Sequence, residues 1–477
     1  MKNLSNKIKN IKHVYIIALV FFIIYLALGI LFSYRGETYK TNNFFFEADN
    51  FRALYDLTSF EFNHYRTKVH PIFVLLFQPI AVMFNILFKS DILSVIVLES
   101  IIAALNIITI YKIFKTIKIK EKMNIILTLI YGFSFSSLIF VSIPETFVFA
   151  SFLLLLMWLY IIKLFYSDKK INTINYIVLV LTGIGALSIT VTNFVQFIIA
   201  IFFLLLYKQK THKIIKSILA TILLTIISFG ITSGLALIQK KIWPTAMNFH
   251  EYLVDFSYND KNEEKYYMSK NIEIQNIKES YKTVFVNSFV PNKIIIKNEM
   301  AWFSKPNILS IMLSLVLISF IIFGIIKAFL KKDNPREKLL ITSITGSLLY
   351  NFVLHLIYGT YESFLYSQHF TFLVIILIGL GFKNARKKYR NISFLIFVAY
   401  LLLQLILNLN SLLTLNKLII EKYGIINDNL KNVYLLNFLK GLLLVNLPYS
   451  IYNIIRNRKI RHFLLTLISI FGILYFI

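Results

Sequence analysis

The chain has 477 residues, of which 57% are hydrophobic and 15% charged, and its formal net charge is +27. Apolar runs of membrane-spanning length exclude the arrangement of about three soluble domains that this length alone would suggest. The absence of cysteine excludes disulfides, thiolate nucleophiles and cysteine-based metal sites.

Most basic residues gather on one side if the chain is threaded alternately through a bilayer from a cytoplasmic N-terminus. The segments on that side hold 30 Lys and Arg residues and four acids. They are 1–13, 112–122, 163–174, 208–216, 327–338, 383–390 and 455–461. The positive-inside rule therefore predicts a cytoplasmic N-terminus. In this orientation most carboxylates lie on the outer face. Topology and anionic headgroups explain the high net charge better than nucleic acid does.

The spanning segments must be helices, because backbone polar groups cannot stay unpaired in lipid. Thirteen spans are predicted, with the C-terminus outside. They lie near 14–33, 91–111, 123–141, 146–165, 175–192, 194–207, 214–238, 308–328, 339–358, 368–382, 391–408, 433–453 and 462–477. The fold class is therefore an all-α, multi-pass protein of the cell membrane. Its Lys-, Ile- and Asn-heavy composition is typical of an AT-rich bacterium.

Two outer segments are substantial, the first loop at 34–69 and a polar, Tyr-rich loop at 239–307. The second loop is long enough to cap a cavity, and it separates a transmembrane module (1–238), which includes the first loop and segment 70–88, from C-terminal transmembrane helices (308–477). The apolar segment 70–88 is ambiguous. A full crossing there would turn every later basic loop outward, and its prolines at 71 and 79 suit a broken helix. We therefore interpret 70–88 as an interfacial or re-entrant helix on the outer face.

The first outer loop contains FFFEADNFRALYDL (44–57), in which Glu47 and Asp49 form an acidic E-x-D pair. The three preceding phenylalanines would hold this pair at the membrane interface. In a helix, Asp49, Arg52 and Asp56 would share one stripe. A carboxylate beside a cavity could act as a general base or as a metal ligand. The alternative is a self-paired, solvated interfacial helix.

A basic cluster, HYRTKVHP (64–71), follows on the same outer face. It contains Arg66, Lys68 and His70. Its cations could bind a phosphate or pyrophosphate presented at the membrane surface. The alternative is a set of long side chains that anchor the chain among lipid headgroups.

Further acids occur at two outer turns and within one span. Glu145 in SIPETF (142–147) is either a site residue or an acid that stabilises the N-terminus of the next helix. The turn YGTYESFLYSQHF (358–370) offers Tyr361 and Glu362 for hydroxyl-rich groups and His369 for a phosphate. Glu99 lies inside a span, where an acid is costly unless it is paired or used.

The order of these features resembles the GT-C superfamily of polyprenyl-phosphate-dependent membrane glycosyltransferases, such as protein O-mannosyltransferases and lipid A aminoarabinose transferases. The resemblance covers roughly residues 10–240. It rests on the first span, the E-x-D acids, the basic His-Pro stretch and the acid after the third span. The chain departs from relatives with a large C-terminal soluble domain, since residues after 308 remain apolar.

The resemblance implies a bundle of GT-C type and an inverting transfer of a hexosyl or pentosyl group from a polyprenyl-phosphate sugar. The acceptor would be a glycan, a lipid or a protein on the extracytoplasmic face. The implied catalytic acids are Asp49 or Glu47, and Glu145. The implied donor-phosphate ligands are Arg66, Lys68 and His70, with Tyr361, Glu362 and His369 as further substrate contacts. No cofactor is required, although a divalent metal ion is left open.

Two other functions are compatible with a polytopic chain. A lipid-linked glycan flippase or other transporter would favour repeated halves and mid-membrane polar groups, whereas the acids here gather at the outer boundary. A polysaccharide polymerase or ligase would favour catalytic Arg and His in the large outer loop. Loop 239–307 contains one histidine, His250, and no arginine.

Overall fold

The computed structural model describes residues 2–34, 44–209, 214–248, 272–297, 299–304, 307–330, 334–359, 362–385 and 387–423. Within them the chain is helical except for one two-stranded antiparallel sheet. Together with the apolar character of the long helices, this confirms the prediction of an all-α membrane protein. The predicted spans 433–453 and 462–477 lie outside the described residues.

Eight helices among the described residues are long and apolar enough to cross a membrane. They lie in α1 (Lys2–Gly29), α4 (Asp91–Thr116), α7 (Phe147–Tyr166), α9 (Phe194–Lys208), α10 (Ile214–Ile242), α14 (Ile308–Leu330), α15 (Pro335–Ile357) and α17 (Lys387–Tyr423). The shorter apolar helices are α3 (Phe73–Phe88), α8 (Thr173–Ile189) and α16 (Thr371–Asn384). The remaining elements are α2 (Asn50–Thr58), α5 (Glu121–Gly132), α6 (Phe135–Phe140), α13 (Ile274–Tyr281), β1 (Ile294–Lys297) and β2 (Met300–Phe303).

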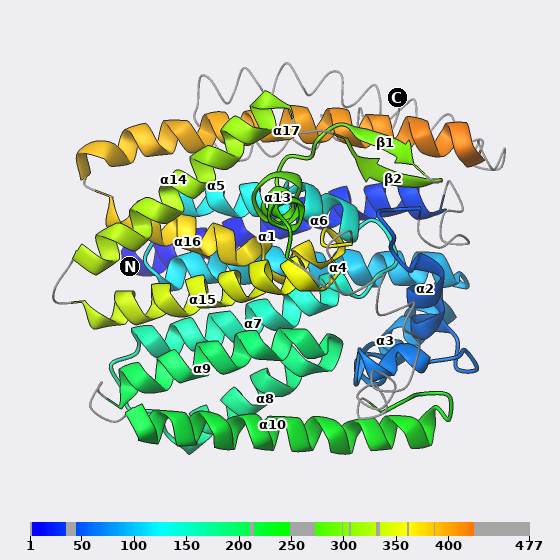
Figure 1. The fold of residues 1–477 in the computed structure, drawn as a ribbon, viewed down its shortest axis with the longest axis horizontal. Helices are drawn as coiled ribbons and strands as arrows, with labels where there is room; N and C mark the ends of the chain where they lie inside the picture. The colour runs from blue at the N-terminus through cyan, green and yellow to red at the C-terminus, as the bar shows by residue number, and fades with distance from the viewer. Residues whose placement is uncertain are drawn as a thin grey trace.

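The long helices run back and forth between two ends of the molecule (Figure 1). α1 begins at the left of the view, where α4, α7, α9, α14 and α16 end and where their successors begin. The basic segments near 117, 168, 209, 334 and 385 therefore share one end of the bundle. α2, α3 and the β1–β2 hairpin lie at the other end, and α3 does not run back across the bundle.

The predicted span 123–141 is broken into α5 and α6 at Phe133 and Ser134. The Ser134 hydroxyl donates to the carbonyl of Tyr131 at 2.7 Å and accepts from the amide of Ser137, so it competes with the helical backbone. The open end of α5 is satisfied from α17. There, the Asn408 side chain donates to the Phe133 carbonyl at 2.7 Å, and the Gln404 side chain donates to the Ile130 carbonyl at 3.1 Å.

Small residues allow two of the late helices to cross closely. A Cβ added at Gly381 of α16 would lie 2.4 Å from the Phe320 carbonyl oxygen of α14, and one at Gly324 would lie 2.7 Å from the Cα of Gly381. Such a pair of glycines lets two backbones approach, which compensates for the weak hydrophobic drive between helices in lipid. α14 and α16 are thereby held as a pair next to α15.

The segment after α1 is held against the hairpin at the end opposite the basic segments. The amide of Ala301 donates to the Phe44 carbonyl at 2.7 Å, and Phe45 forms a parallel bridge with Ala301. Phe46 is 3% exposed and stacks on Phe303 with ring centroids 4.6 Å apart. The expectation that these phenylalanines sit at the membrane interface is therefore wrong, because they fill a buried aromatic cluster. Phe46 and Glu47 both have positive φ, at 54° and 69°, which turns Glu47 out of this cluster.

Candidate functional site

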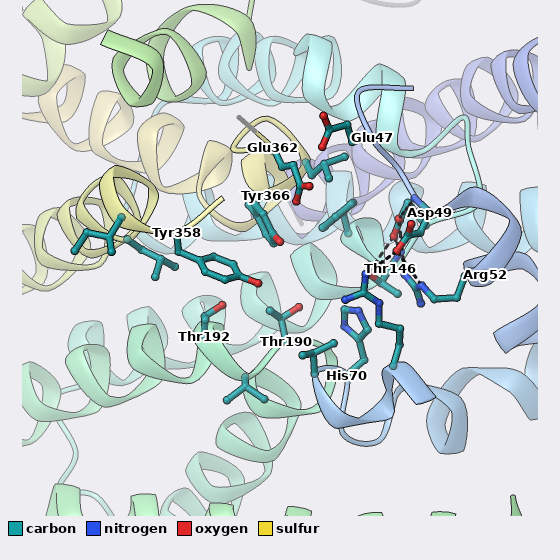
Figure 2. A pocket seen from close by; sticks show the side chains of 18 of the residues that line it. Glu47, Asp49, Arg52, His70, Thr146, Thr190, Thr192, Tyr358, Glu362 and Tyr366 are labelled. Carbon is teal, nitrogen blue, oxygen red and sulfur yellow. Dashed lines mark hydrogen bonds and ion pairs between the residues drawn. The ribbon is translucent and has the colours of Figure 1, made fainter. Parts of the chain in front are cut away.

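A cavity of about 590 Å³ lies where the first loop, the turns that precede α7 and α16 and the end of α15 meet. Its charged lining comes from residues that are far apart in sequence. Its charged residues are Glu47, Asp49, Arg52, Arg66 and Glu145, and His70 and Glu362 are further titratable residues of the lining. Figure 2 shows Asp49, Arg52 and His70 on one side of the cavity, Tyr358 and Tyr366 on the other, and Glu47 near Glu362.

Asp49 is held by two arginines at the start of α2. It occupies the N-cap position, but its carboxylate does not bind the helix amides as an N-cap aspartate usually does. Its Oδ2 accepts from Arg52 Nε at 3.3 Å and from Arg66 Nη2 at 3.1 Å. The side chain keeps 28% of its surface exposed, and it lines the cavity. The predicted acid is therefore oriented by charge pairs rather than used as a helix cap.

Arg52 lies between Asp49 and a second, buried acid. Its Nη1 donates to Asp56 Oδ2 at 2.9 Å, and the other oxygen of Asp56 lies 2.8 Å from His64 Nδ1. The predicted stripe of Asp49, Arg52 and Asp56 is present, because residues three and four apart meet on one helix face. Asp56 and His64 are almost fully buried and do not line the cavity. This buried pair holds the Arg52 guanidinium on the side away from the cavity.

Glu145 supports the same acid from the turn before α7. Its Oε1 accepts from the amide of Asp49 at 2.9 Å and lies 3.8 Å from Arg52 Nη2, while Oε2 accepts from the amide of Thr146 at 2.6 Å. Burial raises the pKa of Glu145 above its ordinary value, although the Arg52 guanidinium opposes this shift. The amide of Glu145 in turn donates to Glu99 Oε1 at 2.8 Å. Both carboxylate oxygens of Glu145 are thus engaged in holding the backbone around Asp49.

The side chains of the basic cluster (64–71) do not all point into the cavity. Arg66 and Lys68 lie in a 3₁₀ turn, Tyr65–Lys68, which has about three residues per turn, so side chains two apart point in different directions. Arg66 lines the cavity and Lys68 does not. His70 also lines it, but its Nδ1 hydrogen-bonds the Ile189 carbonyl, and burial together with Arg52 lowers its pKa well below 6.5. Of the three predicted phosphate ligands, Arg66 is therefore the cation that the structure brings to the cavity.

Glu362 meets Glu47 across the cavity wall. Burial, a hydrogen bond to Glu47 and the negative charge of that residue raise the pKa of Glu362 to about 8. Glu362 is therefore protonated at neutral pH and can donate as well as accept. His369 is buried behind Tyr366, with ring centroids 5.8 Å apart, and does not line the cavity. Tyr361 lies outside the described residues.

One wall of the cavity is apolar and belongs to α15. It is formed by Tyr350, Val353, Leu354 and Ile357. Val353 is 42% exposed, so this face of the helix is open at the side of the bundle. The Tyr350 hydroxyl donates to the Thr192 carbonyl at 3.0 Å and joins the apolar wall to the turn between α8 and α9. The cavity therefore combines a charged end with an apolar surface of a candidate membrane span.

No protein-family model matches the sequence, and no curated protein matches it. Among solved structures, the chain is similar to the archaeal oligosaccharyltransferase AglB from Archaeoglobus fulgidus in complex with an inhibitory peptide and a dolichol-phosphate, with a TM-score of 0.39 and 11% identity. The likeness covers 89% of this chain and 58% of that protein, so the chain spans less than two thirds of its length. A TM-score this low does not establish a shared fold, and the site is interpreted from its own geometry.

The metal ion that the sequence left open does not fit the residues present. In the described part of the chain, no three His, Asp or Glu side chains are placed to hold a metal ion together. Asp49 is engaged by two arginines, and Glu145 accepts hydrogen bonds at both oxygens.

Two threonines that the sequence did not single out also line the cavity. Thr190 and Thr192 lie in the break between α8 and α9, where Thr190 is extended and Val191–Asn193 forms a 3₁₀ turn. The amide of Val191 donates to the Val69 carbonyl at 3.3 Å, which brings this turn beside the basic cluster. The available signal was the polar SITVTN interruption between two apolar runs, which does not by itself reveal a cavity.

Proposed function

We propose that the chain is a membrane glycosyltransferase of GT-C type that moves a hexosyl or pentosyl group from a polyprenyl-phosphate donor to an acceptor hydroxyl on the extracytoplasmic face. The supporting observation is that one cavity joins a fixed arginine–carboxylate cluster to the apolar wall of a candidate membrane span. An amphiphilic lipid phosphate needs both surfaces. Its isoprenoid chain would lie along α15, and its phosphate would meet Arg66.

The proposed reaction is a single displacement at the anomeric carbon. The acceptor oxygen forms the new bond to this carbon as the bond to the phosphate oxygen breaks, so the configuration inverts. We assign Asp49 as the base that takes the acceptor proton, through Oδ1, since both arginines bind Oδ2. Arg66 stabilises the charge that develops on the departing polyprenyl phosphate. Glu47 is the alternative base, and Glu145 positions Asp49.

The proposed location of the cavity can be tested by single-cysteine labelling, because the chain has no cysteine of its own. Asn63 and Lys169 are exposed and lie at opposite ends of the bundle. In intact cells, a membrane-impermeant maleimide should label Asn63→Cys, and it should label Lys169→Cys only after permeabilisation. The reverse pattern would place the cavity on the cytoplasmic side and remove the extracytoplasmic assignment.

The proposed reaction can be tested in membrane vesicles that contain or lack the chain. Polyprenyl-phosphate sugars with a labelled glucose, mannose, galactose or arabinose would be supplied as donors. Chain-dependent transfer of label to a glycan, lipid or protein fraction is expected for at least one donor, and Asp49→Asn should abolish it. Chain-dependent movement of a labelled lipid across the bilayer, without transfer, would instead identify a flippase.

A further inference from the structure

The wall of the cavity away from Asp49 carries hydroxyl groups. Its polar lining consists of Thr190, Thr192, Tyr358 and Tyr366. Figure 2 shows the two tyrosine side chains and the two threonine side chains directed into the same space. They come from the α8–α9 break, the end of α15 and the turn before α16, so the group is assembled by the tertiary structure.

Thr190 provides an independent indication of a ligand. The residue is 8% exposed, lines the cavity, and its Oγ1 has no hydrogen-bond partner among the described residues. A buried hydroxyl without a partner destabilises the fold, because it has lost its hydrogen bonds to water. A ligand hydroxyl at this position would remove that cost. Buried polar groups nearly always have a hydrogen-bond partner, so such a hydroxyl requires a ligand, a water molecule or an ion beside it.

The other groups of this wall are fixed and uncharged. Tyr366 stacks on His355 with ring centroids 5.0 Å apart and hydrogen-bonds Tyr358. Burial raises the pKa of Tyr366 well above 10, so its phenol remains a donor. Glu362 adds a carboxyl group that is protonated at neutral pH, since its pKa is about 8. Together these groups offer hydrogen-bond donors and acceptors without a cation.

We propose that this wall, made of Thr190, Thr192, Tyr358, Tyr366 and Glu362, is a subsite for the glycosyl ring of the donor and selects a sugar that carries no acidic group. This inference rests on the proposed function. A ring with several hydroxyls matches a surface that both donates and accepts hydrogen bonds. A uronic acid would instead bring a further carboxylate beside Glu47, which contacts Glu362 of this wall, and like charges repel.

The test is equilibrium binding of labelled lipids to the chain in nanodiscs. The probes are polyprenyl phosphate, its glucose, mannose and galactose derivatives, and its glucuronate derivative. At least one neutral hexose lipid should bind more tightly than bare polyprenyl phosphate, and the glucuronate lipid should not. Thr190→Val should lower this preference by about threefold to tenfold, with binding of bare polyprenyl phosphate unchanged. Tyr358→Phe removes a second hydroxyl and should act in the same direction.

Thr182→Val is the matched control, because Thr182 lies on the neighbouring helix α8, donates to the Leu179 carbonyl and does not line the cavity. It should leave every affinity unchanged. If bare polyprenyl phosphate binds but no neutral hexose adds affinity, or if Thr190→Val and Tyr358→Phe keep the full preference, the subsite is wrong and the proposed function stands. Preferred binding of the glucuronate lipid overturns the selectivity. If no lipid binds, both proposals fail.

Discussion

The two ends of the bundle use the same kinds of ion pair in different surroundings. At the end that carries the basic segments, Arg336 binds Asp168 at 2.8 Å, and Lys383 binds Glu337 at 2.5 Å. At the cavity end, Arg52 and Arg66 bind Asp49. The first set joins α15 to α16 and to the turn after α7. The second set holds a carboxylate at the edge of an open space.

Burial and charge balance separate the Arg336–Asp168 pair from the cluster around Arg52. The Asp168 side chain is 91% exposed, so solvent screens its pair with Arg336. Around Arg52, the side chains of Asp56 and Glu145 are each 3% exposed, and three acids converge on one guanidinium. Exposed pairs tie helices together at little cost. A buried cluster with an excess of acids is costly to build, which indicates that its geometry serves a purpose beyond stability.

The largest difference between the two ends is expected in the transfer rate when an acid is replaced. Asp49→Asn keeps the shape of the side chain and removes its charge, so transfer should fall about 10²- to 10⁴-fold, as for loss of a general base. Asp168→Asn should change transfer by no more than about twofold, because its pair is solvent-exposed. Rates are compared in vesicles with equal amounts of folded chain. Near-normal turnover in both Asp49→Asn and Glu47→Gln would show that the base lies elsewhere, with Glu145 as the next candidate.

The arginines should differ in their effect on stability. Arg52→Leu leaves two buried acids without their partner, and we expect the free energy of unfolding to fall by about 3–5 kcal/mol. Arg336→Leu should lower it by about 1 kcal/mol or less. Both values can be measured by SDS titration in mixed micelles. Equal losses for the two variants would mean that the buried cluster is no more structural than the exposed pair.

Within the cavity end, Arg66 and Lys68 provide a finer comparison. Arg66→Ala removes one of the two arginines that line the cavity, and the affinity for polyprenyl phosphate should fall about tenfold or more, as for a hydrogen bond to a charged group. Lys68→Ala should change this affinity by about twofold or less, since Lys68 does not line the cavity. Labelled-lipid binding in nanodiscs measures both. A larger loss in Lys68→Ala would contradict the assignment of Arg66 as the phosphate ligand.

A different kind of effect, a dependence of stability on pH, is expected at Glu362. Because its pKa is raised from 4.5 to about 8, the folded chain holds a proton that the unfolded chain releases above pH 4.5. The contribution of Glu362 is therefore most favourable at low pH and is lost as pH rises from about 4.5 to 8. The stability of the wild type relative to Glu362→Gln should decline across this window and level off above it. A flat difference would show that Glu362 is not buried against Glu47.

Local sequence determined what depends on neighbouring residues and on composition. Apolar run length predicted the helical class, and most long helices follow the predicted order. The basic segments were expected on one side, and the described ones share one end of the bundle. The stripe of Asp49, Arg52 and Asp56 was also predictable, because a helix always brings residues three and four apart together. The break at Ser134 within a predicted span was missed, since its capping depends on Asn408 and Gln404 of a distant helix.

The tertiary structure decided which polar residues share one cavity. The bond from the Asp49 amide to Glu145 joins residues 96 positions apart, and the contact of Glu47 with Glu362 spans most of the described chain. No periodicity reports such contacts, because they depend on how helices pack and where a helix breaks. Packing also decided that Arg66 rather than Lys68 lines the cavity. It likewise left the Thr190 hydroxyl without a partner among the described residues. Sequence determined the helical class and the order of the long helices, and the direction of each side chain was decided by the packing around it.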